Sequence, residues 1–281
     1  MQVFGLAFLS RYMNKGGNIL EQKKKEKEKA VVYRQTQRAT GVFDMWIETS
    51  IAKQARPGQF ISVYTQNQSA LLPRPISVCE TDKEKGRLRI VYRVAGTGTK
   101  EFSAYKSGHQ IDVLGPLGNG FPLEEAKGKR VFFVGGGIGI PPMLELAKAI
   151  TDAVSKDILL GYRNNELFLA EDLKKYGNVH IATEDGSVGT KGTVMDAIAA
   201  NGLNADIIFA CGPMPMLRAI KQYAKERDIP AYISLEERMA CGVGACLGCV
   251  VKTKEIDHHS HVNNARICTD GPVYLAERVE I

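Results

Sequence analysis

The chain has 281 residues, of which 44% are hydrophobic and 24% charged, a globular composition with apolar material for about two domains. The net charge is +6, but five lysines fall in the run EQKKKEKEK at residues 21–29. Such a run is usually a solvated tail or helix face. No arginine-rich or aromatic-interleaved stripe accompanies it, which argues against nucleic-acid binding.

The first twenty residues contain a short apolar stretch, but they lack the basic segment and the cleavage site of a signal peptide. No segment approaches the length of a membrane span. Six cysteines without a secretion signal argue against a disulfide scaffold, so we expect a cytoplasmic protein. We expect residues 1–29 to form a disordered or extended segment ahead of the folded body.

Residues 30–127 predict an antiparallel β domain. Apolar and polar residues alternate there in short segments separated by glycine or proline. These segments are VFDMWIETS, GQFISVYTQ, RPISVCE, GRLRIVYRV and GHQIDVLGP. Several short strands at this spacing are typical of a small antiparallel barrel or sandwich.

Residues 128–233 show a different pattern. RVFFVGGGIGIPPMLELAKAI predicts a strand, a glycine turn and an amphipathic helix. Further strands, DILLGYR, NVHIATED and DIIFACGP, alternate with helical stretches such as MLRAIKQYAKERD, which indicates a doubly wound parallel α/β domain. Residues 234–281 have less regularity and predict a small cysteine-bearing domain. The predicted fold class is therefore α+β multidomain, with a β-barrel, an α/β domain and a small C-terminal domain.

The segment GGGIGIPPM, residues 135–143, follows a predicted strand and begins a predicted helix. Its glycines can bring backbone N–H groups close to a pyrophosphate at the positive end of the helix. The strict fingerprint GxGxxG is not met, because Ile140 stands at the third glycine. A tight turn that requires glycine explains the pattern about equally well. Pro141 and Pro142 suit the first turn of a helix.

Three further motifs can each bind a ligand or have an ordinary structural role. CGPMPM, residues 211–216, follows a strand at the sheet edge where such folds bind ligands, although Cys211 alone could be a small buried apolar side chain. In RPISV, Arg74 could hold a phosphate as a bidentate donor or be an ordinary surface arginine. VYRVAGTGT, residues 91–99, ends in residues suited to backbone contact with phosphate.

In this order the motifs resemble the ferredoxin–NADP reductase superfamily, and the resemblance covers residues 30–232. In that superfamily a β-barrel with an R-x-x-S motif holds FAD, and an α/β domain with GGGxGxxP and CGP motifs holds the nicotinamide nucleotide. The resemblance implies FAD contacts from Arg74, Pro75, Ile76, Ser77, Val91, Tyr92, Arg93, Gly98 and Thr99. It implies NAD contacts from Gly135, Gly136, Gly137, Gly139, Glu184, Asp185, Cys211 and Gly212.

Glu184 and Asp185 bear on the choice of nucleotide. Relatives that use NADP often carry Ser-Arg at the end of the strand that corresponds to NVHIATED. Two carboxylates at this place would repel a 2′-phosphate and could accept hydrogen bonds from a ribose hydroxyl. We therefore expect NADH rather than NADPH as the substrate.

The C-terminal cysteines have the spacing C-x4-C-x2-C, formed by Cys241, Cys246 and Cys249, followed by Cys268. This matches the plant-type 2Fe–2S spacing, whereas zinc sites usually pair two C-x2-C units or include histidines. Zinc remains the alternative. His258, His259 and His261 lie between the third and fourth cysteines, and we expect them to be exposed to solvent in a charged loop.

The combination of these sites predicts an electron-transfer protein. NADH gives up two electrons together, a cluster accepts one at a time, and a flavin exchanges electrons in both ways. No acid–base constellation for a second substrate is evident, so we expect that substrate to react on another subunit.

MACGVGACLGCVVK and ICTDGPVYLAERV are similar to the family of dihydroorotate dehydrogenase B electron-transfer subunits. This resemblance implies electron transfer between NAD and an FMN-containing catalytic subunit through FAD and a 2Fe–2S cluster. The catalytic subunit oxidises dihydroorotate to orotate in pyrimidine biosynthesis, and the complex is a heterotetramer with two copies of each subunit. The gap before Cys268 and the N-terminal extension are longer than the family pattern.

Two alternatives stay open from the sequence. One is the small subunit of an NADH-dependent ferredoxin:NADP oxidoreductase, also called sulfide dehydrogenase. It resembles the chain throughout but has aspartate in place of one cluster cysteine. The other is a binding module without redox activity, stabilised by zinc on a degenerate reductase scaffold.

Overall fold

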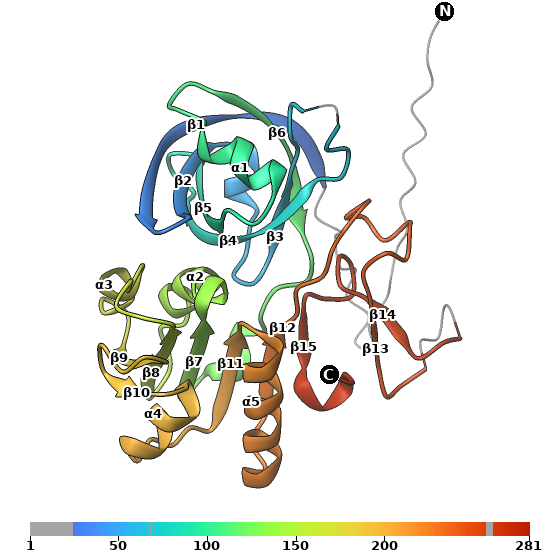
Figure 1. Ribbon diagram of the computed structural model, residues 1–281. Coiled ribbons are helices and arrows are strands. Elements are labelled where there is room, and N and C mark those ends of the chain that lie inside the picture. The colour runs from blue at the N-terminus through green and yellow to red at the C-terminus, as the bar shows by residue number, and fades with distance from the viewer. Residues whose placement is uncertain (1–24, 68, 257–260) are drawn as a thin grey trace, which may run out of the picture.

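The computed structural model describes residues 25–67, 69–256 and 261–281. Figure 1 shows a barrel packed against a layer of helices and a sheet, with the C-terminal segment beside both. The predicted fold class is confirmed. Most of the predicted N-terminal segment, residues 1–24, and the loop histidines His258 and His259 lie outside the described residues. In the described part of the chain, no helix is long and apolar enough to cross a membrane.

Within the described residues, six antiparallel strands close the barrel in the order β1-β2-β5-β4-β3-β6. Their bounds are β1 (Glu26–Ala39), β2 (Val42–Glu48), β3 (Phe60–Val63), β4 (Arg74–Asp82), β5 (Arg87–Arg93) and β6 (Gln110–Leu117). The segments predicted as strands correspond to β2 to β6. Strand β1 begins before the expected boundary at residue 30, and its pairing with β6 closes the barrel.

The barrel is filled by alternate residues of its strands. On β3, Ile61 and Val63 point into this core, while Phe60 belongs to a different core outside the barrel. Helix α1 (Thr97–Ser103) packs on the barrel through the fully buried Phe102. Short 3-10 helices η1 (Ser50–Lys53) and η2 (Leu123–Ala126) lie in the connections.

The second sheet, counted over the same described ranges, has seven strands in the order β10-β9-β8-β7-β11-β12-β15. Its parallel strands are β7 (Arg130–Gly136), β8 (Ser155–Tyr162), β9 (Asn178–Thr183), β10 (Thr190–Lys191), β11 (Ile207–Cys211) and β12 (Ala231–Ser234). The helices are α2 (Pro141–Ala149), α3 (Ala170–Leu173), α4 (Val194–Ala200) and α5 (Met214–Arg227). This is the doubly wound arrangement that the alternating pattern predicted.

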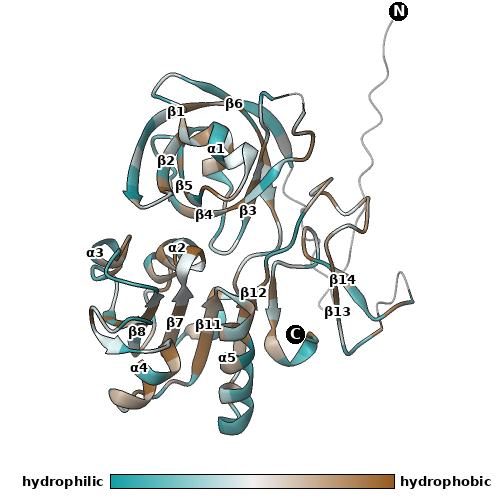
Figure 2. Cartoon of the chain, viewed as in Figure 1, coloured by the Kyte–Doolittle hydropathy of each residue, from teal (hydrophilic) through white to brown (hydrophobic). Residues whose placement is uncertain are grey.

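Helices cover both faces of this sheet (Figure 1). On β7, Val131 and Phe133 pack in the same core as α2 and α3, and Phe132 and Val134 in the same core as α4 and α5. Because both faces are buried, the strands are apolar throughout. Figure 2 shows this hydrophobic colour on β11 and hydrophilic colour at the end of α5.

The cysteine-bearing segment is joined to the α/β sheet. It contains the hairpin of β13 (Val250–Lys252) and β14 (Asn264–Arg266), then β15 (Val273–Leu275) and η4 (Ala276–Arg278). Strand β15 pairs antiparallel with β12 at the edge of the sheet. Cys249 and Cys268 also belong to the hydrophobic core beneath α4 and α5. This segment therefore shares both a sheet and a core with the α/β domain.

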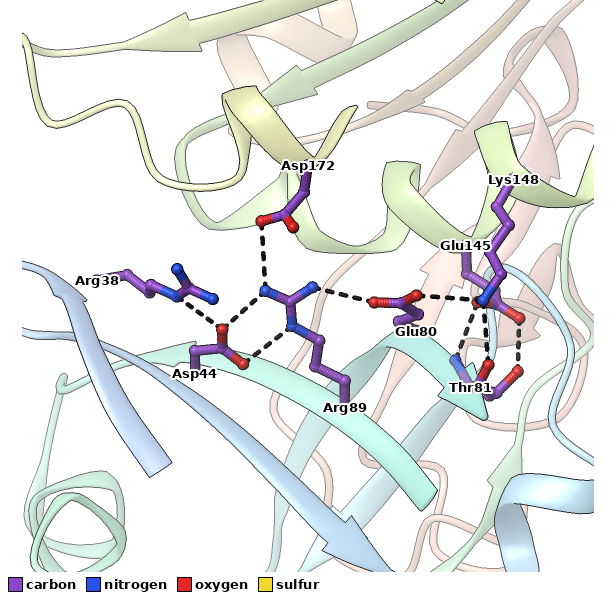
Figure 3. Close-up of polar contacts among 8 residues, drawn as sticks. All are labelled: Arg38, Asp44, Glu80, Thr81, Arg89, Glu145, Lys148 and Asp172. Carbon is purple, nitrogen blue, oxygen red and sulfur yellow. Dashed lines mark hydrogen bonds and ion pairs between the residues drawn. The ribbon is translucent and has the colours of Figure 1, made fainter. Parts of the chain in front are cut away.

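A buried ion-pair network connects the barrel to the α/β domain (Figure 3). Arg89 on β5 is 3% exposed and forms a bidentate pair with Asp44 on β2, with distances of 2.7 and 3.0 Å. Its other contacts are Glu80 on β4 at 3.0 Å and Asp172 on α3 at 3.4 Å. Arg38 also donates to Asp44 at 2.8 Å. Burial lowers the pKa of Arg89, but Asp44 and the other nearby negative charges raise it by more, so the guanidinium stays charged.

A second part of the network joins β4 to α2. The carboxylate of Glu145 accepts hydrogen bonds from the backbone N–H and the hydroxyl of Thr81, at 3.0 and 2.6 Å. Lys148 pairs with Glu80 at 3.2 Å and donates to the Thr81 carbonyl. Helix α2 is therefore held against the barrel by paired polar groups as well as by its apolar side chains.

Removing the Arg89 side chain is expected to destabilise the protein strongly. In Arg89→Ala the buried carboxylate of Asp44 loses its bidentate partner, and breaking such a buried pair typically costs about 3–5 kcal/mol of unfolding free energy. Urea denaturation measures this loss. Arg130→Ala is the matched control, because the Arg130–Asp206 pair is exposed to solvent and contributes far less. Similar denaturation midpoints for the two variants would contradict the importance of the network.

Candidate cofactor sites

The glycine turn of the α/β domain packs tightly against the end of β11. The turn runs from β7 through the 3-10 helix η3 (Gly137–Gly139) into α2, whose first turn holds Pro141 and Pro142 as expected. A Cβ on Gly139 would overlap the carbonyl group of Cys211, and one on Gly212 would lie 3.0 Å from the backbone nitrogen of Gly136. Glycine is therefore required at both positions for the two loops to touch. The sequence analysis did not predict this role.

A cleft of about 740 Å³ opens at the carboxyl ends of β7, β8, β9 and β11. This is the edge at which doubly wound sheets bind ligands. The predicted nucleotide-site residues that line it are Gly136, Gly137, Gly139, Glu184 and Gly212, and the predicted flavin-site residue Arg93 lines it too.

Three of the predicted nucleotide-site residues do not line this cleft. Gly135 is buried in β7, where a Cβ would lie 2.9 Å from Ile140 Cα. The thiol of Cys211 is fully buried in β11, and this burial raises its pKa. Asp185 uses its carboxylate to accept hydrogen bonds from the hydroxyl and the backbone N–H of Ser187, at 2.7 and 2.9 Å, and these bonds lower its pKa. Of the two adjacent acids, Glu184 is the one that faces the cleft.

Two charged groups from distant parts of the chain meet in the cleft. Arg93 lies at the end of β5 in the barrel, with Nη2 3.6 Å from the position of a Cβ on Gly137, which has a φ of +52°. Glu236 follows β12, and its exposed side chain lines the cleft. Neighbouring protein reduces its solvation, which raises the pKa of Glu236, and the positive charge of Arg93 partly offsets the effect. Thr40 and Glu166 also line the cleft. The backbone N–H and the hydroxyl of Thr40 donate hydrogen bonds to the Glu166 carboxylate, at 2.8 and 2.6 Å.

Sequence reasoning missed several residues that line the cleft, among them Arg163, Glu166, Thr193 and Glu236. Arg163 directly follows β8, so its place at the carboxyl edge of a predicted strand could have indicated it. Thr193 precedes α4, and its hydroxyl donates to Asp196 at 2.7 Å in a capping box. Glu236 gave no comparable signal, because it lies in the segment assigned to the cysteine domain.

The predicted phosphate-binding residues of the barrel are brought together at the start of α1. A Cβ on Gly98 would overlap the guanidinium group of Arg74 and would lie 2.9 Å from its Cδ. The same guanidinium donates to the carbonyls of Ala70, at 3.3 Å, and of Leu72. A positive side chain thus converges with the positive end of a helix, an arrangement that suits an anion such as a pyrophosphate.

The other predicted flavin residues differ in their exposure. Pro75 and Ser77 are half-buried, and Ile76 points into the barrel core. Val91 is buried in the core shared with α2. Tyr92 lies inside the barrel and donates to Gln35 at 2.8 Å, and burial raises its pKa.

The remaining member of the predicted flavin set, Thr99, stabilises its own loop. Its hydroxyl accepts hydrogen bonds from the backbone N–H groups of Ala95 and Gly96, at 2.9 and 3.1 Å. The side chains of this set therefore do not all reach one surface.

The four motif cysteines form two neighbouring pairs. Partial burial raises the pKa of the Cys241 thiol, but hydrogen bonds from the backbone of Val243 and from Cys246 lower it by more, to about 6. The amides of Val243 and Ala245 lie 3.4 and 3.3 Å from the Cys241 sulfur. In the other pair, burial and the hydrogen bond with Cys249 raise the pKa of Cys268 to about 12.

Two thiol pairs, one of them with two amides directed at the Cys241 sulfur, suit a cluster of two irons, since each iron takes two thiolates. Over residues 25–67, 69–256 and 261–281, no group of three or more His, Cys, Asp or Glu side chains could hold a metal ion, so the four cysteines are present as two pairs and not as a closed set of ligands. His261 is exposed, as expected.

A buried hydroxyl beside the second pair also fits such a group. The Tyr274 hydroxyl has no hydrogen-bond partner in the described part of the chain. Its ring packs against Gly271, where a Cβ would lie 2.6 Å from the hydroxyl oxygen. Burial, then the charges of Asp270, Cys249 and Cys268, raises its pKa. The hydroxyl is thus an available donor near the cysteines.

Three family models match the chain. Residues 32–121 match the oxidoreductase FAD-binding domain, and residues 133–222 match the oxidoreductase NAD-binding domain. Residues 236–280 match the iron–sulfur cluster binding domain of dihydroorotate dehydrogenase B. With the fold, these matches define an oxidoreductase with FAD-binding, NAD-binding and iron–sulfur domains.

Curated relatives narrow this class. The dihydroorotate dehydrogenase B (NAD(+)) electron transfer subunit of Shouchella clausii (strain KSM-K16) is 42% identical over 256 residues, covering 89% of this chain and 97% of the relative. The subunit of the same name in Bacillus cereus (strain B4264) is 41% identical over 254 residues, covering 89% and 96%. The chain belongs to the family of dihydroorotate dehydrogenase B electron transfer subunits.

Solved structures share the architecture. The structure described as NADH-dependent reduced ferredoxin-NADP oxidoreductase matches with a TM-score of 0.80 and 33% identity, covering 89% of each chain. A ferredoxin reductase in carbazole 1,9a-dioxygenase, at a TM-score of 0.65 and 18% identity, covers 76% of this chain and 70% of that one. The second likeness shows the fold alone.

Proposed function

We propose that this chain transfers electrons between NADH and a dihydroorotate-oxidising catalytic subunit that contains FMN, within pyrimidine biosynthesis. The observation that carries the proposal is 42% identity across 97% of a named electron transfer subunit, combined with the match of residues 236–280 to the iron–sulfur domain of the same enzyme. The expected complex has two copies of each subunit and is cytoplasmic.

The chain's own residues have distinct parts in this function. When bound, FAD accepts electrons in pairs and passes them on singly. Arg74 and the start of α1 would hold its pyrophosphate, and the glycine turns at the cleft would hold NADH. Cys241, Cys246, Cys249 and Cys268 would ligate the 2Fe–2S cluster. The glycines that press the two cleft loops together support this role, because they leave the backbone at the sheet edge close to any bound nucleotide.

A second candidate is the small subunit of an NADH-dependent ferredoxin:NADP oxidoreductase. Its support is the likeness, at 33% identity, to the structure of that name. The two candidates differ in the partner subunit and in its substrate. Co-purification from the native cell, followed by assay of the complex with dihydroorotate and NAD, or with NADPH and ferredoxin, distinguishes them.

We expect the purified complex to reduce NAD with dihydroorotate, and the Cys249→Ser variant to lose this activity. Cys249 is buried and pairs with Cys268, so the variant should also lose the cluster's absorption while NADH still reduces FAD. Cys79→Ala removes a buried thiol outside the motif and is expected to keep both activities. Undiminished dihydroorotate-linked activity in Cys249→Ser would exclude the cluster from the electron path.

Gly98→Ala is expected to weaken FAD retention as Arg74→Ala does, because the added methyl group displaces the guanidinium. A charge-assisted contact is worth about 1.5–3 kcal/mol, which corresponds to roughly 10- to 150-fold in affinity. Gly96→Ala, in the same loop, has open space and an extended φ of −176°, so its affinity should stay near that of the unaltered chain. Titration of the flavin-free chain with FAD measures the three affinities. Equal retention in Gly98→Ala and Gly96→Ala would refute this role of Arg74.

Glu184→Ser is expected to improve use of NADPH, whereas Asp185→Ser should change it little. Glu184 lines the cleft, while Asp185 is held by Ser187 in its own turn. Removing a carboxylate close to the 2′-phosphate relieves about 1 kcal/mol or more of repulsion, which should lower the KM for NADPH several-fold. Steady-state reduction of FAD by each nucleotide provides the comparison. A larger effect from Asp185→Ser would place the ribose on the other side of the turn.

A further inference from the structure

Ser62 is a fully buried polar residue on the outer face of the barrel. Its hydroxyl has no hydrogen-bond partner among the residues that the structure describes. Ile61 and Val63 point into the barrel core, so Ser62 between them points outward. There it meets the cysteine-bearing segment, since a Cβ on Gly242 would lie 3.2 Å from the Ser62 hydroxyl oxygen. The hydroxyl is therefore enclosed between the barrel and the loop that follows Cys241.

The loop turns against β3 at this point. Gly242 directly follows Cys241 and has a φ of +68°, and the next amides turn toward the Cys241 sulfur. Tyr64, which directly follows β3, lies near the same thiol. Burial, then the charges of Asp112 and Cys241, raises the pKa of Tyr64. The outer face of β3 thus runs alongside the first cysteine pair.

We propose that the Ser62 hydroxyl donates a hydrogen bond to a sulfur atom of the iron–sulfur cluster or of Cys241, and thereby raises the reduction potential of the cluster. This inference rests on the proposed function, which places the cluster at the four cysteines. A buried hydroxyl without a partner costs free energy. A partner that comes with the cofactor removes this cost. Reduction adds negative charge to the cluster, and a donor to its sulfurs stabilises the reduced state.

The flavin is the competing acceptor. Ser62 pairs in register with Pro75 of the RPISV segment, so β3 also borders the proposed flavin site. The contact that the structure gives to the hydroxyl is nevertheless with Gly242, next to Cys241. This contact favours the cluster as the acceptor of the hydrogen bond. The reduction potentials of the cluster and of FAD, measured separately, distinguish the two acceptors.

The test uses the full-length chain in its complex, with redox titrations followed by electron paramagnetic resonance for the cluster and by absorption for FAD. In Ser62→Ala we expect the midpoint potential of the cluster to fall, while the FAD potential, the iron content and the reduction of FAD by NADH stay unchanged. Ser62→Thr keeps the hydroxyl and should keep the original potential. Ser103→Ala removes a hydroxyl that is bonded to Lys100 on α1 and is expected to shift neither potential.

An unchanged cluster potential in Ser62→Ala, or a shift confined to FAD, would overturn the inference. If Ser62→Ala does not retain the cluster, Ser62→Cys serves in its place, because a thiol is a weaker donor. The Thr variant should then have the higher potential of the two, and equal potentials would count against the hydrogen bond. A wild-type complex without a 2Fe–2S signal would overturn the proposed function as well, whereas a normal wild-type signal with unchanged variants overturns this inference alone.

Discussion

The buried guanidinium of Arg89 determines how the barrel meets the α/β domain. Charged groups are rarely buried unless they are paired, and this one has carboxylate partners on two strands of the barrel and on helix α3. A shift of either domain would leave charges buried without partners, which is costly. The network therefore selects one relative position. The same strand extends from Arg89 through Val91 to Arg93, and alternate residues of a strand share a face. Arg93 reaches the cleft about 13 Å beyond Arg89, so the ion pairs also set the position of a cleft side chain.

The C-terminal segment is held from two sides. Strand β15 extends the α/β sheet, and Asn119, just after the barrel, donates to the carbonyls of Asp270 and Val273 at 3.0 and 2.9 Å. Gly118 allows this approach, because a Cβ there would overlap the ring of Pro272. All three parts of the chain thus meet close to the turn that follows Cys268. Such rigid support suits a chain that passes electrons between bound groups, since the separation of those groups is then fixed by the fold.

The sequence predicted most of the fold, because its signals are local. Alternation identified β2 to β6, and apolar runs between helical segments identified the parallel strands β7, β8, β9 and β11, but not the short strands β10 and β12. Strand β1 was missed because its start is rich in lysine and resembles the polar run before it. Alternation alone fits a barrel or a sandwich, and the prediction of a barrel was correct. The closure itself depends on the pairing of β1 with β6, from Val31 with Gln110 to Glu26 with Gly115, and no local pattern records such a pairing.

The site was predicted less completely, for the same physical reason. Motif spacing indicated the glycine turns, the Arg74 segment and the four cysteines. It did not show that Gly139 is needed for contact with Cys211, that the Asp185 carboxylate is bonded to Ser187, or that Glu236 lines the cleft at the sheet edge. Each of these depends on chain segments that only the fold brings together. The sequence also did not show which buried polar groups would lack a hydrogen-bond partner. Asp44 and Glu145 are buried with several hydrogen bonds each, whereas the hydroxyls of Ser62 and Tyr274 have none within the described ranges. Ser62 lies against the cysteine-bearing segment and Tyr274 lies within it. The ring nitrogens of Trp46 and His109 also lack partners within the described ranges, so an unpartnered buried donor indicates a cofactor contact only where a binding motif lies beside it. The sequence supplies the motif, and only the three-dimensional arrangement shows which donor lies next to it.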